Sequence, residues 1–448
     1  MRLSSFVFYA VLAFCAAFQF CAPAAAQTGG AGPRAEYELL FKRTLANPGD
    51  LDAAFKFAEV ANNLGEYEAA IGALERMIFF NPGLSRVRLE LGILYFRLGA
   101  YGQARAYLNS AIEAPNTPTD VSDRVKGFLS EIDRRDQPNQ FSGFAQTGLR
   151  YQSTANTGPA SLNVRALGFD ATLSPTAGKR GDWNWFALGG FRHVFDFGNQ
   201  RGDTWESTAQ YYFAKQFRLS NFDISLAEVT SGPRLSLGLD SLPGWSVRPY
   251  GVVSGLGLGN RNYASTGGGG LSVAMPTTFI SFEAGGEVRR RNFVNSGKFP
   301  TASQQTGTLS SAYVSATVPV MGLFQLRARA IYAVNRADSL FSFNSYTQPG
   351  VDVALAYEFT PPVLSGVRRW TLTPAASFIM ANYKTPNPLI DPGMKRRDRE
   401  FRAGVTLDAP VTDNFGFGAA VQLIRNQSSL PNYRYKNISF LFGPTGRF

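Results

Sequence analysis

The side chains that most often carry catalysis are scarce in this sequence. His193 is the only histidine, and the only cysteines, Cys15 and Cys21, lie close to the N-terminus. A cysteine protease, a zinc site and a disulfide scaffold are therefore excluded, and Ser-His-Asp chemistry has a single candidate base. His193 lies in an alternating segment from Phe191 to Asp196, which favours a structural role over hydrolysis. We predict that the protein is no enzyme and holds no cofactor or metal.

Charged side chains form a second set that could carry chemistry, because they recur at alternate positions in three segments. Within 280–289, 324–335 and 401–408, apolar residues alternate with charged or small ones. If the charged positions share one interior, their arginines either contact an anionic substrate or pair with the carboxylates. These positions are Glu283, Glu287, Arg327, Arg329, Arg402 and Asp408.

Residues 1–26 predict export rather than a structural element. Arg2 supplies positive charge, the segment 6–20 is almost entirely apolar, and the alanines up to Ala26 offer a cleavage site before Gln27. We therefore expect a signal peptide that is cleaved between Ala26 and Gln27. No later stretch reaches the roughly 18 uninterrupted apolar residues of a membrane helix, which excludes an inner-membrane protein.

A 34-residue period identifies the helical part of the chain, residues 35–135. The period and the residue types resemble the tetratricopeptide repeat, in which two helices pack through small residues. This resemblance implies two repeats, flanked by helices over about 36–46 and 119–134, in a short solenoid. An ordinary helical bundle is the alternative interpretation. The clearest recurrences are Asn47-Pro48 as Asn81-Pro82, Leu64-Gly65 as Leu98-Gly99, and Ala70 as Ala104.

The resemblance to tetratricopeptide repeats also implies a candidate binding site, because such repeats can hold a peptide on their concave face. Two repeats would make a shallow groove that binds a protein client or docks a partner. On the family pattern the groove comprises Phe55, Glu59, Asn62, Asn63, Arg86, Ile93, Phe96 and Arg97.

After a linker over 136–140, the apolar period changes to two and stays so over 141–448. A soluble sandwich also alternates, but its domains run to about 100 residues. A transmembrane antiparallel β-barrel explains more, because its apolar face contacts lipid and its polar face lines a wet lumen. Short connections near 276–278, 321–322 and 412–414 lie between longer polar ones at 290–307, 333–347, 382–399 and 425–436, as expected for the two rims.

The number of strands follows from a count of fifteen strand-like segments, because bacterial single-chain barrels have an even number. We predict 14 strands, with the segment 163–173 placed in a loop. The alternative is 16 strands, which requires the segment 222–239 to break at Ser231-Gly232-Pro233.

The end of the chain carries an independent indication of a barrel. Phe440, Phe442 and Phe448 share one face of the last segment. This pattern resembles the signal that outer-membrane proteins present to the barrel-assembly machinery, which we expect as a partner during biogenesis. Pro444 departs from it because proline cannot donate to a strand ladder, so we expect Pro444 near a rim.

Charge separates the two parts of the chain. Residues 27–140 carry 13 Lys and Arg against 15 Asp and Glu, whereas residues 141–448 carry 30 against 18. Nucleic-acid binding does not fit an exported membrane protein, so anionic lipopolysaccharide or an anionic substrate is the expected partner of the basic part. The basic run 395–399 is expected to be a solvated or lipopolysaccharide-facing loop, and the glycines 267–270 to relieve crowding in the barrel wall.

Several short motifs accompany the order of signal, short repeat module and barrel: Leu74-Glu75-Arg76, Asn81-Pro82, Arg88-Leu89-Glu90-Leu91-Gly92, Tyr95, Leu98-Gly99, Gly232-Pro233-Arg234, Arg248-Pro249-Tyr250, Phe299-Pro300-Thr301-Ala302 and Leu430-Pro431-Asn432-Tyr433. In this order and in these motifs the chain resembles the surface lipoprotein assembly modifier (Slam) family over about 35–448. That resemblance implies a 14-stranded barrel that helps a surface lipoprotein or a secreted scavenging protein cross the outer membrane, with the repeats in the periplasm. It implies no catalytic residues and leaves the client unknown, and we expect a monomer. A polysaccharide-export porin is the alternative, although such proteins usually carry more repeats.

Overall fold

The computed structural model describes most of the chain from residue 31 to residue 448. These residues form two compact units, and the boundary between them along the chain lies between Pro138 and Asn139. The predicted cleavage site, Ala26 and Gln27, lies outside the described residues. Also outside them are 48, 114–117, 136, 200, 240–241, 278, 321–322 and 362–367.

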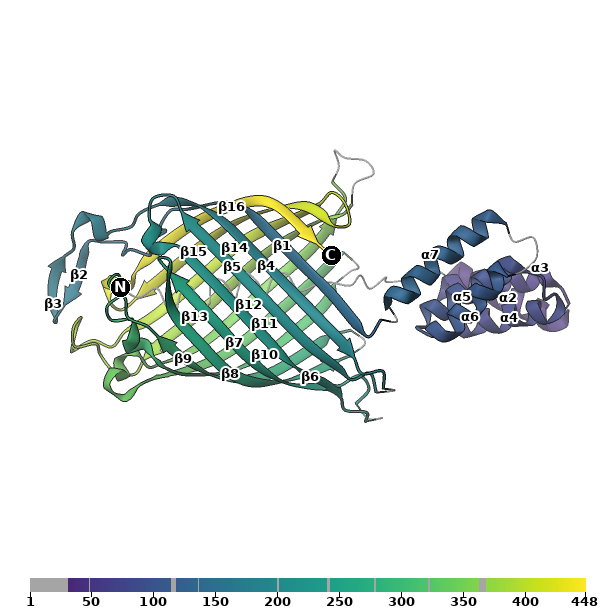
Figure 1. The fold of residues 1–448 in the computed structure, drawn as a ribbon, viewed down its shortest axis with the longest axis horizontal. Coiled ribbons are helices and arrows are strands. Elements are labelled where there is room, and N and C mark those ends of the chain that lie inside the picture. The colour runs from purple at the N-terminus through teal and green to yellow at the C-terminus, as the bar shows by residue number, and fades with distance from the viewer. Residues whose placement is uncertain are drawn as a thin grey trace. The chain divides into compact units, whose positions relative to one another are not determined.

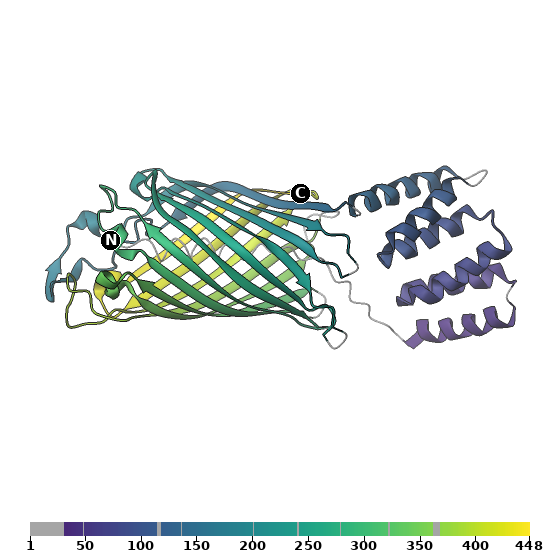
Figure 2. The same ribbon diagram turned by 60° about the horizontal axis from the view of Figure 1, so that its bottom comes forward.

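Helices make up the first unit, and each described helix packs against the next in chain order (Figure 2). None of the described helices is both long and apolar enough to cross a membrane. Their bounds are α2 (Ala31–Ala46), α3 (Leu51–Leu64), α4 (Tyr67–Phe80), α5 (Ser85–Arg97), α6 (Tyr101–Ile112) and α7 (Thr119–Arg135).

The repeat predicted from the sequence is present in the helical unit, because α5 begins 34 residues after α3 and α6 begins 34 residues after α4. Asp50 caps α3 by accepting a hydrogen bond from the Ala53 amide at 3.0 Å. Gly65 and Gly99 follow the first helix of each pair with φ of 80° and 74°, a conformation in which glycine avoids steric cost. The unit is therefore built from helix pairs of tetratricopeptide type, as predicted.

Small residues allow the two helices of each pair to approach closely. Ala61, Ala70 and Ala104 are completely buried between helices. A Cβ atom on Gly92 would lie 2.6 Å from Cγ of Leu108, so this crossing of α5 and α6 requires glycine. The core is thus close-packed, and added volume in it is costly.

A closed antiparallel barrel of 14 strands forms the second unit (Figure 1). Each strand pairs with its neighbour along the barrel, and β1 pairs with β16 to close it. The barrel strands are β1 (Asn139–Gln152), β4 (Asp182–Asp196), β5 (Thr204–Gln216), β6 (Ile224–Ser236), β7 (Ser246–Leu258), β8 (Arg261–Pro276), β9 (Ser281–Phe293), β10 (Gly307–Val320), β11 (Phe324–Ala337), β12 (Tyr346–Phe359), β13 (Trp370–Tyr383), β14 (Arg397–Pro410), β15 (Phe415–Ser428) and β16 (Tyr435–Arg447).

The strand count of 14 is confirmed, for the reason that the sequence suggested. The segment 163–173 lies in a loop, where β2 (Asn163–Ala166) and β3 (Phe169–Thr172) form a separate two-stranded sheet. The strand β6 continues through Ser231-Gly232-Pro233 instead of breaking there. The alternative of 16 strands is therefore wrong.

The two ends of the barrel differ in their connections. We call the end where β1 begins and β16 ends the near rim, and the opposite end the far rim. Near-rim connections over 277–280 and 411–414 are short, although those from β6 to β7 and from β12 to β13 are longer. The longest connection, over 153–181, lies at the far rim and contains β2 and β3. The other far-rim loops are shorter than predicted, because the strands that they connect extend further. One of them is only Gly259-Asn260, whose φ angles of 59° and 62° form a tight hairpin turn.

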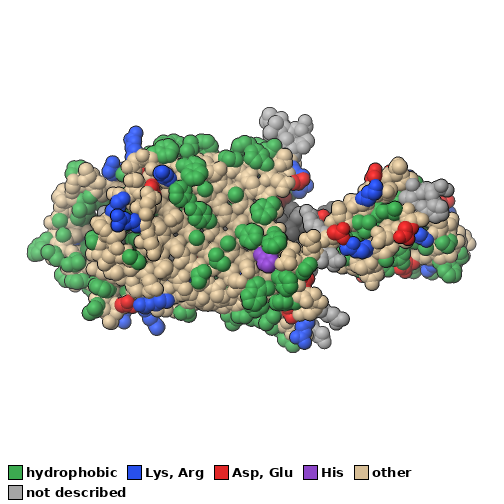
Figure 3. All heavy atoms as spheres, in the orientation of Figure 1, with side chains coloured by type: hydrophobic (Ala, Val, Ile, Leu, Met, Phe, Trp, Pro, Cys, Tyr) green, Lys and Arg blue, Asp and Glu red, His purple; other side chains and the backbone are tan. Residues whose placement is uncertain are grey.

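Apolar side chains point outward along the barrel wall. Phe282, Val288, Tyr332 and Val405 are exposed, while their sequence neighbours face the interior. On the face seen in Figure 3, the wall between the two ends of the barrel carries few charged side chains. This is the surface that lipid requires, and together with closure of the sheet it supports an outer-membrane location.

Part of the interior differs from the wet lumen that alternation predicted. Inward-facing Phe186, Leu188 and Leu226 are buried together with Phe222 and Phe299 from far-rim loops. These loop residues pack into the barrel, so apolar side chains are buried on the inner face as well. The alternation of the strands could not show this, because it depends on where the loops fold.

Candidate functional site

Some residues of the groove predicted on the helical unit are buried between helices and do not line an open surface. Ile93 is 6% exposed and packs in the core between α5, α6 and α7, so placing it in an open groove was wrong. Phe96 is half-buried, with its ring centroid 5.5 Å from that of Phe128 and 5.8 Å from that of Tyr101. Both side chains therefore stabilise the helix packing.

The polar residues of the predicted groove connect neighbouring helices. The Arg97 guanidinium donates to Oδ1 of Asn62 at 2.5 Å, which links α5 to α3. Arg86 forms an exposed ion pair with Asp120 at 3.3 Å, which links α5 to α7. The groove residues that remain exposed without these contacts are Phe55, Glu59 and Asn63.

A more apolar surface lies on the other helix of each pair, along α2 and α4. Phe79 is 81% exposed and contacts Phe80 edge-on at the end of α4. Phe41 and Leu45 of α2 are also exposed, and both line a hollow of about 130 Å³ between α2, α3 and α4. We call these four residues the α2–α4 surface. The sequence carried a signal that was missed, because Leu45 and Phe79 stand 34 residues apart, at equivalent positions of successive units.

A tyrosine pair stiffens the junction of α4, α5 and α6. The hydroxyls of Tyr95 and Tyr107 donate to the same Glu75 oxygen at 2.8 and 3.0 Å, and their rings stack 5.4 Å apart. Burial, followed by the hydrogen bond to Glu75, raises the pKa of Tyr95 to about 12. The pair is therefore neutral at physiological pH and holds the three helices together.

The six charged residues expected in the lumen lie on the inward face of their strands, with partners that differ from the expected ones. Arg402 pairs with Glu400 at 2.5 Å, and Asp408 pairs with Arg447 at 3.2 Å. Glu283 accepts a hydrogen bond from the Tyr313 hydroxyl of β10, and Glu287 accepts one from the Tyr250 hydroxyl of β7 and pairs with Arg289 of its own strand. Arg329 lies over the Tyr313 ring at 4.3 Å, and Arg327 faces the same interior.

The glycine run in β8 makes room for one of these contacts. A Cβ atom on Gly270 would lie 2.6 Å from the Tyr250 ring, which reaches across to Glu287. A Cβ atom on Gly268 would overlap the carbonyl of Val288 in β9. The glycines therefore relieve crowding in the wall, as predicted.

A second cluster of charges surrounds Glu206, close to the end of the barrel that we call the near rim. Arg192, Arg234 and Arg248 lie 3.1, 2.8 and 3.4 Å from its carboxylate. One carboxylate with three arginines leaves positive charge on this part of the inner wall. This cluster contributes to the basic character of the barrel unit.

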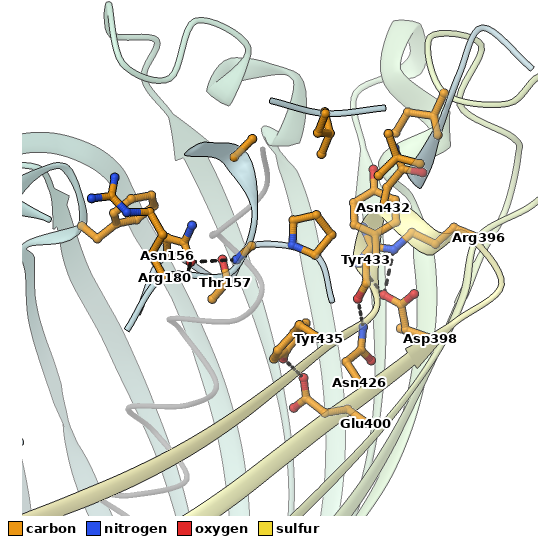
Figure 4. Close-up of a pocket in the computed structure, with 18 of the residues that line it drawn as sticks. Asn156, Thr157, Arg180, Arg396, Asp398, Glu400, Asn426, Asn432, Tyr433 and Tyr435 are labelled. Atoms are coloured by element: carbon orange, nitrogen blue, oxygen red, sulfur yellow. Dashed lines mark hydrogen bonds and ion pairs between the residues drawn. The ribbon is translucent and has the colours of Figure 1, made fainter. Parts of the chain in front are cut away.

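A hollow of about 590 Å³ lies at the far rim of the barrel unit (Figure 4). We call it the mouth pocket. The loop over 153–181 forms one wall, with Asn156, Thr157 and Arg180, and strands β14 to β16 form the facing wall. The facing wall contributes Asp398, Glu400, Arg402, Asn426 and Tyr435.

Two residues of the basic run 395–399, Arg396 and Asp398, line this pocket instead of facing solvent as expected, whereas Lys395, Arg397 and Arg399 are exposed. The Arg396 side chain is only 15% exposed and lies over the rings of Tyr383 and Tyr433, at 4.5 and 3.5 Å. Its Nε donates to Asp398 at 2.7 Å. Burial alone would lower the pKa of Arg396, but the nearby Tyr383 and Asp398 outweigh it and raise that pKa.

The remaining singled-out residues lie on the outward face or at the seam of the barrel. His193 stacks on Phe141 at 4.7 Å, and its Nε2 lies 2.8 Å from Oδ1 of Asn139. Phe440 and Phe442 point outward with their rings 5.5 Å apart, and Phe448 is 67% exposed. No described acid or nucleophile is paired with His193 in a catalytic arrangement.

No protein-family model matches this sequence, and no curated protein matches it. The translocator chaperone SycD of Yersinia enterocolitica is similar over 30% of this chain and 85% of its own, with 14% identity and a TM-score of 0.22. PcrH in complex with the chaperone binding region of PopD is similar over 31% of this chain and 97% of its own, with 13% identity and a TM-score of 0.23. A loop-deletion mutant of OmpT, an outer-membrane protein of Vibrio cholerae, is similar over 69% of this chain and 99% of its own, with 10% identity and a TM-score of 0.37.

Proposed function

We propose that this protein helps a protein client, either a surface lipoprotein or a secreted scavenging protein, to cross the outer membrane. The observation that supports the proposal is the α2–α4 surface. A helical unit of this size gains nothing from exposing Phe41, Leu45, Phe79 and Phe80 to water. Such a surface suits an extended, apolar segment of a client that has not yet folded.

We place the helical unit in the periplasm, on the side of the membrane from which a client would come. The helix α7 ends at Arg135 and β1 begins at Asn139 on the near rim. A linker of so few residues reaches only about 3.5 Å per residue, far less than the roughly 30 Å of a bilayer core. The near rim then faces the periplasm, and the far rim faces the cell exterior.

In this proposal the protein performs no catalysis and acts as a monomer. Its outward face contacts lipid and lipopolysaccharide, and the barrel-assembly machinery inserts it. A polysaccharide-export porin is the second candidate function, because the mouth pocket is polar and rich in tyrosine and arginine. The two candidates differ in which unit meets the cargo first.

The deciding experiment replaces Phe79 and Phe80 by serine and measures surface display of the protein encoded by the neighbouring gene. We expect display to fall at least about tenfold, because the loss of two phenyl groups from the contact removes more than the roughly 1.4 kcal/mol that a factor of ten requires. The matched control is Leu98→Ser, which changes an exposed apolar residue outside the α2–α4 surface. Normal display in F79S/F80S, together with lost exopolysaccharide in a deletion strain, would instead support sugar export.

A further inference from the structure

The mouth pocket contains polar atoms whose hydrogen bonds are incomplete. Oδ1 of Asp398, Oδ1 of Asn426, Oε1 of Gln348 and the Tyr346 hydroxyl are all buried without a partner among the described residues. Tyr346, Asp398 and Asn426 are 4%, 8% and 5% exposed. Buried polar atoms are nearly always paired in folded proteins, so this convergence in one hollow indicates a ligand.

The chemistry of these atoms restricts the ligand to one that donates hydrogen bonds. Three of the four are oxygen acceptors, and the hydroxyl can take either role. A cationic donor is disfavoured, because Arg396 and Arg402 already neutralise Asp398 and Glu400 on the same wall. Sugar hydroxyls donate without carrying charge, and the tyrosine rings beside them offer apolar faces.

Two further arginines of the mouth pocket favour a ligand that also carries negative charge. Arg180 and Arg218 line the pocket, are exposed, and have no described side-chain partner. Four arginines and two carboxylates line the hollow in total. Arginine in such a position binds carboxylate or phosphate through charge-assisted hydrogen bonds.

We propose that the mouth pocket binds an acidic oligosaccharide. Its hydroxyl groups occupy the wall of Tyr346, Asp398 and Asn426, and its carboxylate or phosphate lies against Arg180 and Arg218. The volume of about 590 Å³ is in the range of small-molecule sites. The site does not depend on client transport, because it lies entirely in the barrel unit and the α2–α4 surface lies in the other.

The acidic sugar has two possible sources, the core of lipopolysaccharide and a soluble acidic glycan. Binding is measured by calorimetry on the full-length protein in detergent, purified free of lipopolysaccharide. The probes are trigalacturonate, neutral maltotriose and triglutamate, with lipopolysaccharide added as a competitor. We expect trigalacturonate to bind at least about tenfold more tightly than maltotriose or triglutamate.

Two variants test the two walls separately. R180Q/R218Q should remove most of the preference for trigalacturonate over maltotriose, whereas the control R201Q/R261Q makes the same charge change outside the pocket and should retain it. Tyr346→Phe removes only the unpaired hydroxyl and should weaken both sugars by about threefold.

The outcomes test separately where the sugar comes from and whether the site binds it. Displacement of trigalacturonate by lipopolysaccharide identifies the core as the source, and its failure identifies a soluble glycan. The proposal is overturned if triglutamate binds as tightly as trigalacturonate, if no sugar binds, or if R201Q/R261Q loses binding to the same extent as R180Q/R218Q.

Discussion

The amide of Gly143 donates to the carbonyl of Phe448, and the amide of Phe448 donates back to the carbonyl of Gly143, both at 3.0 Å. The last residue of the chain thus joins β16 to β1 and completes the ring of strands. The Phe448 ring also covers Gly143, where a Cβ atom would lie 2.6 Å from it. The same residue that carries the terminal aromatic signal thus extends the ladder between β1 and β16 that closes the barrel.

Deleting Phe448 should impair assembly of the barrel, because it removes two hydrogen bonds of the seam and the last outward aromatic side chain. The intact protein should fractionate with the outer membrane and migrate faster on a gel before boiling than after. We expect the deletion to reduce this heat-modifiable form and to activate the envelope stress response. Unchanged assembly after removal of the last eight residues would show that the signal lies elsewhere.

Replacing Gly443 by valine should prevent closure of the same seam. Pro444 has no amide to donate, and the ladder between β1 and β16 is interrupted opposite it, between Gln146 and Leu149. There the backbones approach so closely that a Cβ atom on Gly443 would overlap the carbonyl of Thr147. We expect loss of the heat-modifiable band.

The control for this seam variant lies on the same strand. A Cβ atom on Gly446 would have its nearest neighbour at 3.8 Å, an ordinary contact, so Gly446→Ala should assemble normally. If the two variants assemble equally well, the close approach at Gly443 does not limit closure.

Replacing Gly92 by alanine should destabilise the helical unit, although alanine favours helices. The new methyl group would meet Leu108 and the Ala104 carbonyl, which costs about 1–3 kcal/mol of unfolding free energy. Gly127→Ala is the matched control, because nothing lies within 4 Å of its Cβ position in α7. That change should stabilise by roughly 0.5–1 kcal/mol. Circular dichroism of helix unfolding measures whether each variant raises or lowers the unfolding free energy. Equal changes in the two variants would contradict the packing argument.

The helical unit should lose stability as the pH rises above 10. Tyr95 has a pKa of about 12 in the folded unit and about 10 when unfolded, so the unfolded state releases its proton first. The contribution is complete below pH 10 and is lost as the pH rises through the folded pKa. Between about pH 9 and pH 11 the midpoint of helix unfolding should therefore fall less in Tyr95→Phe than in the unchanged protein. An identical pH dependence in both proteins would rule out this role for Tyr95.

Periodicity in the sequence determines most of the architecture. A 34-residue spacing of small residues is enough to specify helix pairs, because each pair must present the same small side chains to its neighbour. Alternation likewise fixed which side of each strand meets lipid, since successive side chains point to opposite faces. The even strand number left two alternatives, 163–173 in a loop or a break at Ser231-Gly232-Pro233, and the structure shows the first of them.

Only the tertiary structure decided where the candidate sites lie. Ile93 fitted a groove by repeat position, but the packing of α7 against α5 and α6 buries it. Asp398 belongs to a charged run that was expected to be solvated, whereas in the structure it lines one pocket with Tyr346 of β12 and Asn426 of β15. Local patterns record which face a side chain occupies. They do not record which loops fold over it, because that depends on contacts between residues far apart in the chain.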